Sequence, residues 1–355
     1  MGDRSCDAVF VGGGPIGLAS AWRAGQRGLD VLVLERDHAG AGAADVAAGW
    51  LAPITETHFD EHDDQLQRRL EACAAYPGFV AELAQETAVD PGYHPCGTLA
   101  VALDRDDVES LRREYDFLRA LDLDVEWLLP SEARALEPAL SPRVAGALHA
   151  PSEAAVDPRR LCRALAAAVG DRLVEGAAVT DLLRDGDRVT GVRTAVGDCV
   201  HADTVVVTTG AWSGSWLPPE LAPPVRPVKG QVLVLGGAEP CTRALRTSGI
   251  YIVPRGDGRL VLGATVEERG FDTTVTAGGV HELLREAYRV LPEIAELELL
   301  EARASLRPGS PDNSPIIGPG PVPGLVYATG HYRNGILLTP TTADEVAALL
   351  AGVHA

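Results

Sequence analysis

The chain has 355 residues, of which 46% are hydrophobic, so it is long enough for a large core divided between two domains. Its formal charge of −19 predicts an acidic surface, which argues against nucleic acid and anionic membranes as partners. No apolar run approaches the roughly 18 residues of a membrane span, and the N-terminus lacks the basic stretch of a secretory signal. The six cysteines show no disulfide or metal-ligand spacing. We therefore expect a soluble cytoplasmic protein without a metal site.

The first 35 residues read as strand, turn, helix and strand. Asp7–Val11 is a short apolar run typical of a buried parallel strand. Pro15 stands where a helix begins, and Ile16–Arg27 has helical composition. Val31–Leu34 predicts a second buried strand, which Glu35 closes. This order predicts a βαβ unit.

The rest of the chain alternates helical and extended patterns. Residues 171–209 combine short strands with tight turns. Prolines between residues 218 and 227 indicate a crossing between two domains. Helices are expected at residues 61–90, 105–121, 158–169, 278–290 and 342–350, and strands at 99–103, 204–207, 231–235, 249–253, 259–264 and 325–329.

One basic residue differs in type from all the others. Lys229 is the single lysine among 31 basic residues, and the rest are arginine. An ammonium is a compact point charge, whereas a guanidinium is a wide planar fork. The lysine therefore reflects either chance or a position where a guanidinium does not fit.

The turn after the first strand carries the pattern GxGxxG at Gly12–Gly17. Such a turn lets the backbone approach a pyrophosphate, which then meets the positive end of the helix dipole. Glu35 follows at the distance expected for the acid that accepts hydrogen bonds from ribose hydroxyls. The unit therefore predicts a dinucleotide site. We expect one such site, because alternating prolines prevent residues 318–324 from starting a helix in the same way.

Six further segments follow one another along the chain: Ala47–Pro53, Val205–Ser213, Pro227–Gln231, Tyr251–Arg255, Leu306–Gly309 and Gly330–Ile336. In this order they resemble the D-amino acid oxidase superfamily of FAD-dependent enzymes, and most of all its glycine oxidase branch. The resemblance spans residues 5–350 and implies an α/β fold. A Rossmann-like FAD-binding domain is expected from residues 1–80, 146–226 and 325–355, and a substrate domain with an antiparallel sheet from residues 81–145 and 227–324.

The resemblance implies roles for three side chains. Arg307 matches the arginine that holds the substrate carboxylate, since its fixed fork of donors suits a bidentate pair. Tyr251 matches a tyrosine whose hydroxyl faces the same carboxylate, and Arg333 matches a second arginine near flavin and substrate. From the residues alone, the two arginines could equally form surface salt bridges, and the tyrosine could belong to the core.

The resemblance also implies FAD as a non-covalent cofactor. Cys241 is the last cysteine and Val46 takes the place of an attachment histidine, so neither covalent linkage of related enzymes is expected. Gly330–Ile336 is expected to start the C-terminal helix with its amides toward the flavin, and His331 to contact the flavin rather than shuttle protons. The expected cofactor contacts are Gly12, Gly14, Pro15, Ile16, Gly17, Glu35, Arg36, Ala47, Ala48, Gly49, Trp50, Leu51, Val179, Thr209, Gly210, Trp212, Gly330, His331, Tyr332, Arg333, Asn334, Gly335 and Ile336.

Three positions depart from the family pattern. Trp50 stands where the flavin segment commonly carries methionine, and Gly249 lies where a histidine can precede the substrate tyrosine. Val266 replaces the lysine that monomeric sarcosine oxidases use for oxygen activation. We expect the small Gly249 and Val266 to widen the substrate pocket beside Tyr251, and Trp50 to reshape its mouth.

The implied activity is oxidation of glycine, or of a glycine that carries a sizeable group on its nitrogen. Hydride would pass from the substrate to the flavin, water would hydrolyse the imine to glyoxylate and the free amine, and O2 would become H2O2. One alternative is a D-amino acid or sarcosine-type oxidase or dehydrogenase with another electron acceptor. Another is a flavin-binding protein without amine chemistry. The sequence leaves the oligomeric state open.

Overall fold

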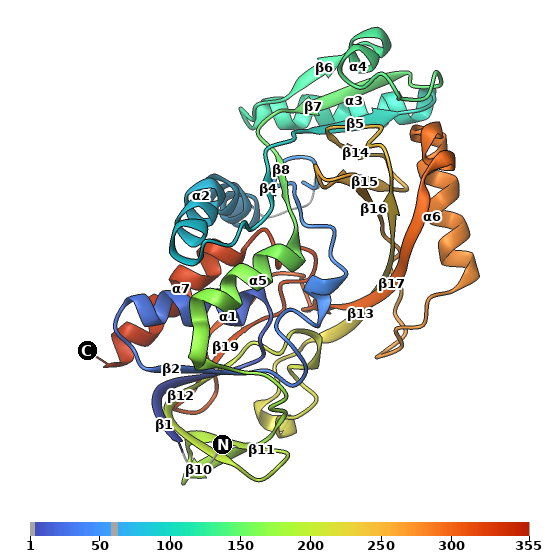
Figure 1. Ribbon diagram of the computed structural model, residues 1–355. Helices are drawn as coiled ribbons and strands as arrows, with labels where there is room; N and C mark the ends of the chain where they lie inside the picture. The colour runs from blue at the N-terminus through green and yellow to red at the C-terminus, as the bar shows by residue number, and fades with distance from the viewer. Residues whose placement is uncertain (1–3, 58–62, 355) are drawn as a thin grey trace.

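The computed structural model describes residues 4–57 and 63–354, and its strands form two large sheets that lie in separate parts of the molecule (Figure 1). Within the described residues each large sheet has eight strands. A small third sheet consists of β3 (Trp50–Leu51), β8 (Ala154–Val156) and β4 (Tyr93–His94). This arrangement agrees with an α/β fold of two parts.

The first sheet has a parallel centre and antiparallel additions. Its order is β10-β11-β12-β1-β2-β9, with β19 paired to β12 and β18 to β19. β1 runs parallel to both neighbours, so that Phe10 lies beside Val206 on one side and Val33 on the other. Central strands of this kind are apolar because both faces are covered. The strands are β1 (Arg4–Val11), β2 (Val31–Leu34), β9 (Leu173–Val174), β10 (Val179–Asp185), β11 (Arg188–Thr194), β12 (Cys199–Val207), β18 (Ile316–Pro319) and β19 (Leu325–Thr329).

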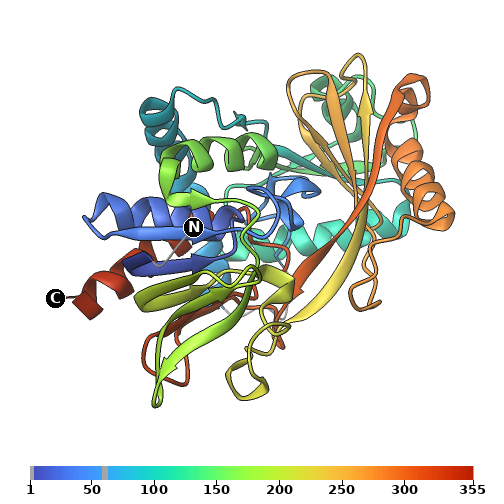
Figure 2. The same ribbon diagram turned by 60° about the horizontal axis from the view of Figure 1, so that its bottom comes forward.

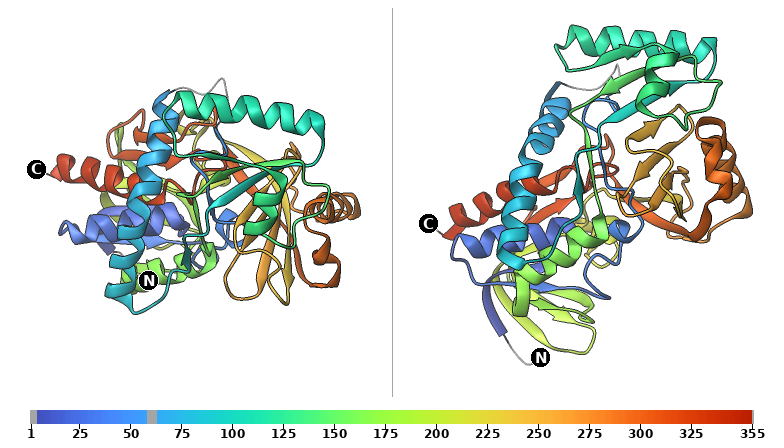
Figure 3. Two further views of the ribbon diagram at one scale, coloured as in Figure 1. Left: turned by 90° about the horizontal axis from the view of Figure 1, so that it is seen from above. Right: turned by 45° about the horizontal axis from the view of Figure 1, so that its top comes forward.

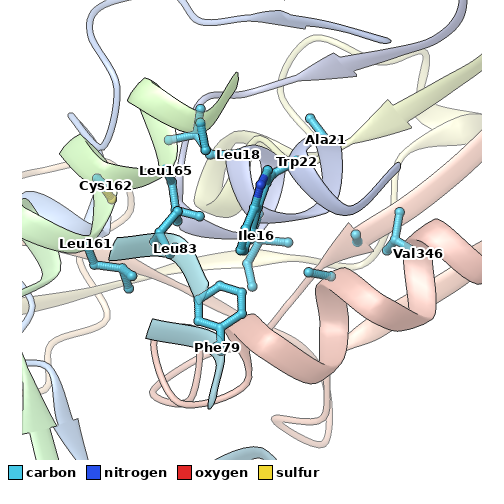
Figure 4. Close-up of a cluster of buried hydrophobic side chains, with 14 of the residues drawn as sticks. Ile16, Leu18, Ala21, Trp22, Phe79, Leu83, Leu161, Cys162, Leu165 and Val346 are labelled. Atoms are coloured by element: carbon cyan, nitrogen blue, oxygen red, sulfur yellow. The ribbon is translucent and has the colours of Figure 1, made fainter. Parts of the chain in front are cut away.

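Helices α1 (Pro15–Gln26), α5 (Pro158–Val169) and α7 (Thr339–His354) pack together on one face of this sheet, and α2 (Asp63–Thr87) lies against α5 and α7 (Figure 3). Their core includes Trp22, which is fully buried and meets Phe79 edge to face at 5.4 Å (Figure 4). Aromatic pairs of this geometry stabilise a core beyond their buried area. Over residues 4–57 and 63–354, no helix has both the length and the apolar character needed to cross a bilayer.

The second sheet has the order β17-β13-β16-β15-β14-β5-β7-β6, and its pairs are antiparallel except for β14 with β5. Figure 2 shows the long strands β13 and β17 running from this sheet toward the first one. Helix α6 (Ala277–Val290) packs on β13 and β16, and α3 (Arg105–Ala120) on β5 and β7; α4 (Pro130–Leu136) lies beside β6 and β7. The strands are β5 (Thr98–Ala102), β6 (Glu126–Leu128), β7 (Gly146–Ala150), β13 (Arg226–Gly236), β14 (Ala244–Arg246), β15 (Tyr251–Pro254), β16 (Arg259–Gly263) and β17 (Glu298–Gly309).

The expected domain boundaries assign two strands, β7 and β18, to the wrong sheet. β7 begins at Gly146, where the return to the first domain was expected, yet it pairs with β5 in the second sheet. β18 falls in the range expected for the second domain, yet it pairs with β19 in the first sheet. β18 forms a hairpin with β19, the next strand in the chain, whereas β7 pairs with both β5 and β6. Strand pairing therefore overrides the expected boundary at both places.

The C-terminal helix begins later than expected. Residues 330–336 form turns, and α7 starts at Thr339. Gly330 has φ 76° and Tyr332 has φ 48°, and neither value belongs to a right-handed helix. The expectation that Gly330–Ile336 starts this helix is therefore wrong, although the segment does lie directly before it.

Candidate active site

A cavity extends from the β1–α1 turn, past the end of β2, to the ends of β13 and β17. It joins the first sheet to the second, because both contribute to its wall. Most of the expected site residues line it: Gly12, Gly14, Pro15, Ile16, Glu35, Arg36, Ala47, Ala48, Gly49, Trp50, Val179, Thr209, Gly210, Trp212, Tyr251, Arg307, His331, Tyr332, Arg333, Gly335 and Ile336.

The glycines of the first turn have different surroundings. A Cβ on Gly17 would stand 2.1 Å from the carbonyl oxygen of Gly12, so glycine is needed for α1 to approach the turn. A Cβ on Gly14 would meet no protein atom within 4 Å, since this residue faces the cavity. Gly14 caps α1 without a side-chain hydrogen bond, so the first amides of the helix are available to an anion. The turn therefore fits a pyrophosphate.

The end of β2 fits a ribose and its base. Glu35 is fixed by two backbone amides: Gly13 N donates to its Oε2 at 2.6 Å and Asp37 N to its Oε1 at 2.8 Å. Its remaining lone pairs can accept hydrogen bonds from ribose hydroxyls. Beside it, the Arg36 guanidinium lies 5.0 Å from the ring centre of Trp212. Together with the first turn, this end of the cavity suits the ADP half of FAD.

Trp50 forms part of the cavity wall. Gly49 before it has φ 67°, and a Cβ there would stand 2.0 Å from the carbonyl oxygen of Val156, so the chain can turn here only with glycine. The indole Nε1 of Trp50 donates to Oγ1 of Thr98 at 2.9 Å. Its ring lies 5.8 Å from that of Tyr251, at an angle of 44°. The hydrogen bond and the ring contact fix the orientation of this wall.

Arg307 ends in the cavity with most of its donors unused. Its Nη1 donates to the carbonyl oxygens of Lys229 at 3.3 Å and Thr265 at 3.1 Å. Within residues 4–57 and 63–354 no carboxylate lies at ion-pair distance from it. The guanidinium lies over Gly230, where a Cβ would stand 2.4 Å from Nη2. In the described part of the chain, the hydrogen bonds of Arg307 all come from Nη1, so the donors of Nε and Nη2 are available to a ligand.

Arg333 lies on the same cavity but already has a partner. It forms an ion pair with Glu56, whose side chain is less exposed than that of the arginine, 19% against 36%. The carboxylate of Glu56 raises the pKa of Arg333, so the arginine is a permanent cation. Glu56 also lines the cavity, although nothing in its residue type or spacing identified it from the sequence.

His331 is a neutral residue at the cavity wall. It is 2% exposed, and its Nε2 lies 3.1 Å from Oγ1 of Thr342. Burial lowers its pKa to about 3. At neutral pH the imidazole therefore carries no charge, which agrees with a contact residue rather than a proton shuttle.

Several expected site residues lie elsewhere. Four of the expected cofactor contacts do not line the cavity: Gly17, Leu51, Gly330 and Asn334. Val266 is 54% exposed, and Gly249 lies in an exposed turn where a Cβ would be 3.4 Å from the side chain of Glu286. The expectation that these two residues widen the substrate pocket is therefore wrong. Gly249 lies in the bend before β15 and Val266 follows the end of β16, where the position relative to the cavity depends on strand pairing and not on residue type.

The fold and the cavity define a two-part flavin-dependent oxidoreductase, with a dinucleotide turn at one end of the cavity and the guanidinium of Arg307 at the other. The family model described as FAD dependent oxidoreductase matches residues 7–349, and the chain belongs to this family. FAD is accordingly its cofactor.

Within the family, the chain is similar to glycine oxidases. The glycine oxidase of Geobacillus kaustophilus (strain HTA426) is 34% identical over 354 residues, which cover 97% of this chain and 92% of that protein. The crystal structure of glycine oxidase from Geobacillus kaustophilus superposes with a TM-score of 0.92 at 33% identity, covering 98% of this chain and 95% of that one. Iminodiacetate oxidase from Chelativorans sp. BNC1 superposes with a TM-score of 0.87 at 28% identity, covering 97% and 95%.

A longer relative matches over part of its length. The bifunctional protein ThiO/ThiG of Trichormus variabilis (strain ATCC 29413 / PCC 7937) is 38% identical over 349 residues. These residues cover 96% of this chain and 52% of that protein, so the chain spans about half the length of this relative.

Proposed function

We propose that the protein oxidises glycine, or a glycine substituted on nitrogen, at the bond between nitrogen and Cα. FAD would accept a hydride, which carries both electrons, from Cα of the substrate. Water would hydrolyse the resulting imine to glyoxylate and the free amine, and O2 would take up the two electrons and two protons to become H2O2. The observation that carries this proposal is Arg307, an arginine with free donors at the end of a dinucleotide cavity. An arginine fork binds a carboxylate through two parallel hydrogen bonds.

The chain's own residues would hold and orient the substrate. Arg307 would bind the carboxylate, and the hydroxyl of Tyr251, which lines the same cavity, would face it from β15. Trp50 would close the side of the pocket toward β5. FAD, when bound, supplies the acceptor for the hydride. Burial lowers the pKa of His331 to about 3, which makes it a weak base, and Glu56 is paired with Arg333. The amine is therefore expected to lose its proton to water, so the rate should rise with pH through the pKa of the bound amine.

The cofactor would lie along the cavity without a covalent bond. Gly12–Gly17 and Glu35 would hold the ADP half, and residues 47–50 and 331–336 would surround the flavin. Val46, at the place of an attachment histidine, also lines the cavity and offers no nucleophile. Release of free FAD on acid precipitation of the protein is therefore expected.

The similarity to glycine oxidases supports glycine as a substrate, and the similarity to an iminodiacetate oxidase supports N-carboxymethyl amines. The test is anaerobic bleaching of the bound flavin with glycine, sarcosine, iminodiacetate and D-alanine, followed by peroxide detection in air. Bleaching by glycine or by an N-substituted glycine, with peroxide on reoxidation, supports the proposal. A flavin that none of these compounds bleaches contradicts it, and bleaching without peroxide would indicate a dehydrogenase.

A further inference from the structure

Lys229 lies in the interior directly beneath the cavity. Its side chain is fully buried on β13, and its Nζ lies 2.8 Å from Oδ2 of Asp272 and 3.5 Å from Oε2 of Glu267. Both carboxylates belong to the segment of residues 265–272, which follows β16. A hydrogen bond from Lys229 lowers the pKa of Asp272, which keeps the partner ionised. The buried ammonium thus ties this segment to β13.

The backbone of the same segment continues the pairing of β16 along β13. Lys229 N donates to the carbonyl oxygen of Glu267 at 2.9 Å, and Glu267 N donates back to that of Lys229 at 3.0 Å. Gln231 N donates to Oγ1 of Thr265 at 2.9 Å. The position of residues 265–267 therefore depends on β13, and the ion pairs of Lys229 hold the more distant residues 267–272 in place.

Two carbonyl oxygens of these paired backbones accept hydrogen bonds from Arg307. Nη1 of Arg307 donates to the carbonyl oxygen of Lys229 on β13 and to that of Thr265 in the segment paired with it. The two hydrogen bonds of Nη1 restrict the orientation of the planar guanidinium, which lies over Gly230, and both residues line the cavity. A shift of residues 265–272 would move the carbonyl oxygen of Thr265 and so change the orientation of the Arg307 guanidinium.

We propose that Lys229 is a positioning residue for Arg307: it anchors residues 265–272 so that the carbonyl oxygens of Lys229 and Thr265 hold the guanidinium ready for a substrate carboxylate. This inference rests on the proposed role of Arg307. It also explains the single lysine of an arginine-rich chain. An ammonium reaches two carboxylates as a point charge from inside a sheet, whereas a guanidinium would bring five N–H donors into a space that satisfies fewer.

The test uses the FAD-loaded protein and acetate, a carboxylate that has no amine to oxidise. The dissociation constant of acetate is measured from the change in the flavin absorbance spectrum, for the wild type, Lys229→Met, Asp272→Asn, Arg307→Ala and the double variant Lys229→Met/Arg307→Ala. Glu268→Gln is the matched control, because Glu268 belongs to the same segment but forms an exposed pair with Arg226. For active variants, KM and kcat for glycine are measured separately.

We expect Lys229→Met and Asp272→Asn to weaken acetate binding about tenfold and to raise KM by a similar factor, with a smaller change in kcat, because a misplaced fork loses a bidentate pair. Glu268→Gln should bind acetate as the wild type does. In the Arg307→Ala background, Lys229→Met should have no further effect. A non-additive cycle of this kind shows that one residue acts through the other.

The possible failures can be told apart. If Arg307→Ala binds acetate as tightly as the wild type, the proposed role of Arg307 is wrong. If Arg307→Ala weakens binding while Asp272→Asn and a folded Lys229→Met do not, or if the double variant shows an additive loss, the role of Lys229 alone is wrong. If Lys229→Met does not retain FAD, Asp272→Asn decides, because it removes a partner whose side chain is 39% exposed and leaves the buried lysine its second carboxylate.

Discussion

A Cβ built on Gly230 would stand 2.4 Å from Nη2 of Arg307, so the guanidinium lies directly on the backbone of β13. β13 and β17 are neighbours in the second sheet, and Val228 lies opposite Arg307 in their register. The side chain of Arg307 therefore crosses the neighbouring strand at Gly230, which has no side chain. The proposed carboxylate site therefore consists of an arginine together with a glycine that makes room for it.

Gly230→Ala should displace the guanidinium of Arg307 without removing it. We expect the dissociation constant of acetate to rise about tenfold or more, since a small misplacement of a bidentate group is costly, while FAD remains bound. Gly278→Ala is the control, because a Cβ there meets no atom within 4 Å. Tight acetate binding by Gly230→Ala would mean that the fork does not need this orientation.

Arg307→Ala should weaken binding of the amino acid by about 2–5 kcal/mol, the usual cost of truncating one partner of a buried charge pair. Steady-state kinetics with glycine over a wide concentration range would measure this as a loss in kcat/KM. Arg333→Ala makes an informative comparison, because Arg333 is already paired with Glu56 and should contribute less to binding of a single carboxylate. Equal losses in the two variants would contradict this division of roles.

Gly14→Ala and Gly17→Ala should fail in different ways. The methyl group of Gly14→Ala meets no protein atom, so the variant should fold normally but bind FAD more weakly, because the methyl group occupies the space of the cofactor. In Gly17→Ala the methyl group meets the carbonyl oxygen of Gly12 at 2.1 Å, which should lower the thermal stability of the apoprotein as well. Melting temperatures with and without FAD would separate the two effects. An unchanged apoprotein melting temperature in Gly17→Ala would contradict the packing role of this glycine.

Glu56→Gln should change the preference between substrates with one and two carboxylates. The ion pair with Glu56 neutralises Arg333 in the wild type, so a second substrate carboxylate finds no free cation there. In the variant, Arg333 becomes available, and kcat/KM for iminodiacetate relative to glycine should rise several-fold, about 1 kcal/mol for a partly exposed pair. A ratio that stays constant would place the second carboxylate elsewhere.

The sequence predicted the local elements better than the long-range pairing. The bounds of β2 and α5 agree with the expectation, because a buried apolar run and a helix that starts with a proline are local signals. β17 was not expected, because its charged and apolar residues follow no regular period. It lies at an edge of the second sheet. The place of β7 depends on its pairing with β5, from which α3, β6 and α4 separate it in the chain, and no local pattern contains that pairing. β18 pairs with β19, the next strand, and the expected domain boundary was placed between these two strands.

For the site, residue type was informative where a side chain carries the chemistry. Arg307, Tyr251, Trp50 and Arg333 were singled out from the sequence and line one cavity, although their roles remain predictions. Glu56 was missed, because it acts through its partner rather than through a motif. The errors at Gly249 and Val266 have one origin: the position of a residue beside a strand end follows from strand pairing that the sequence does not reveal.

His331 should make the stability of the protein depend on pH below about 6.5. Burial lowers its folded-state pKa to about 3, whereas the unfolded chain has the ordinary value near 6.5. Between these values the unfolded state binds a proton that the folded state does not, so folding stability decreases as the pH falls, by about 1.4 kcal/mol per pH unit. Above pH 6.5 the imidazole is neutral in both states and contributes no pH dependence.

His331→Gln removes this proton site while keeping a side chain that can reach Oγ1 of Thr342. All other titrating groups are shared with the wild type, so the difference between the two free energies of unfolding isolates the contribution of His331. Urea unfolding with a fixed excess of FAD should show the wild type losing about 2 kcal/mol more than the variant between pH 7 and pH 5. Parallel curves for the two proteins would mean that His331 is accessible to protons in the folded state, and a proton-transfer role for it would then have to be considered again.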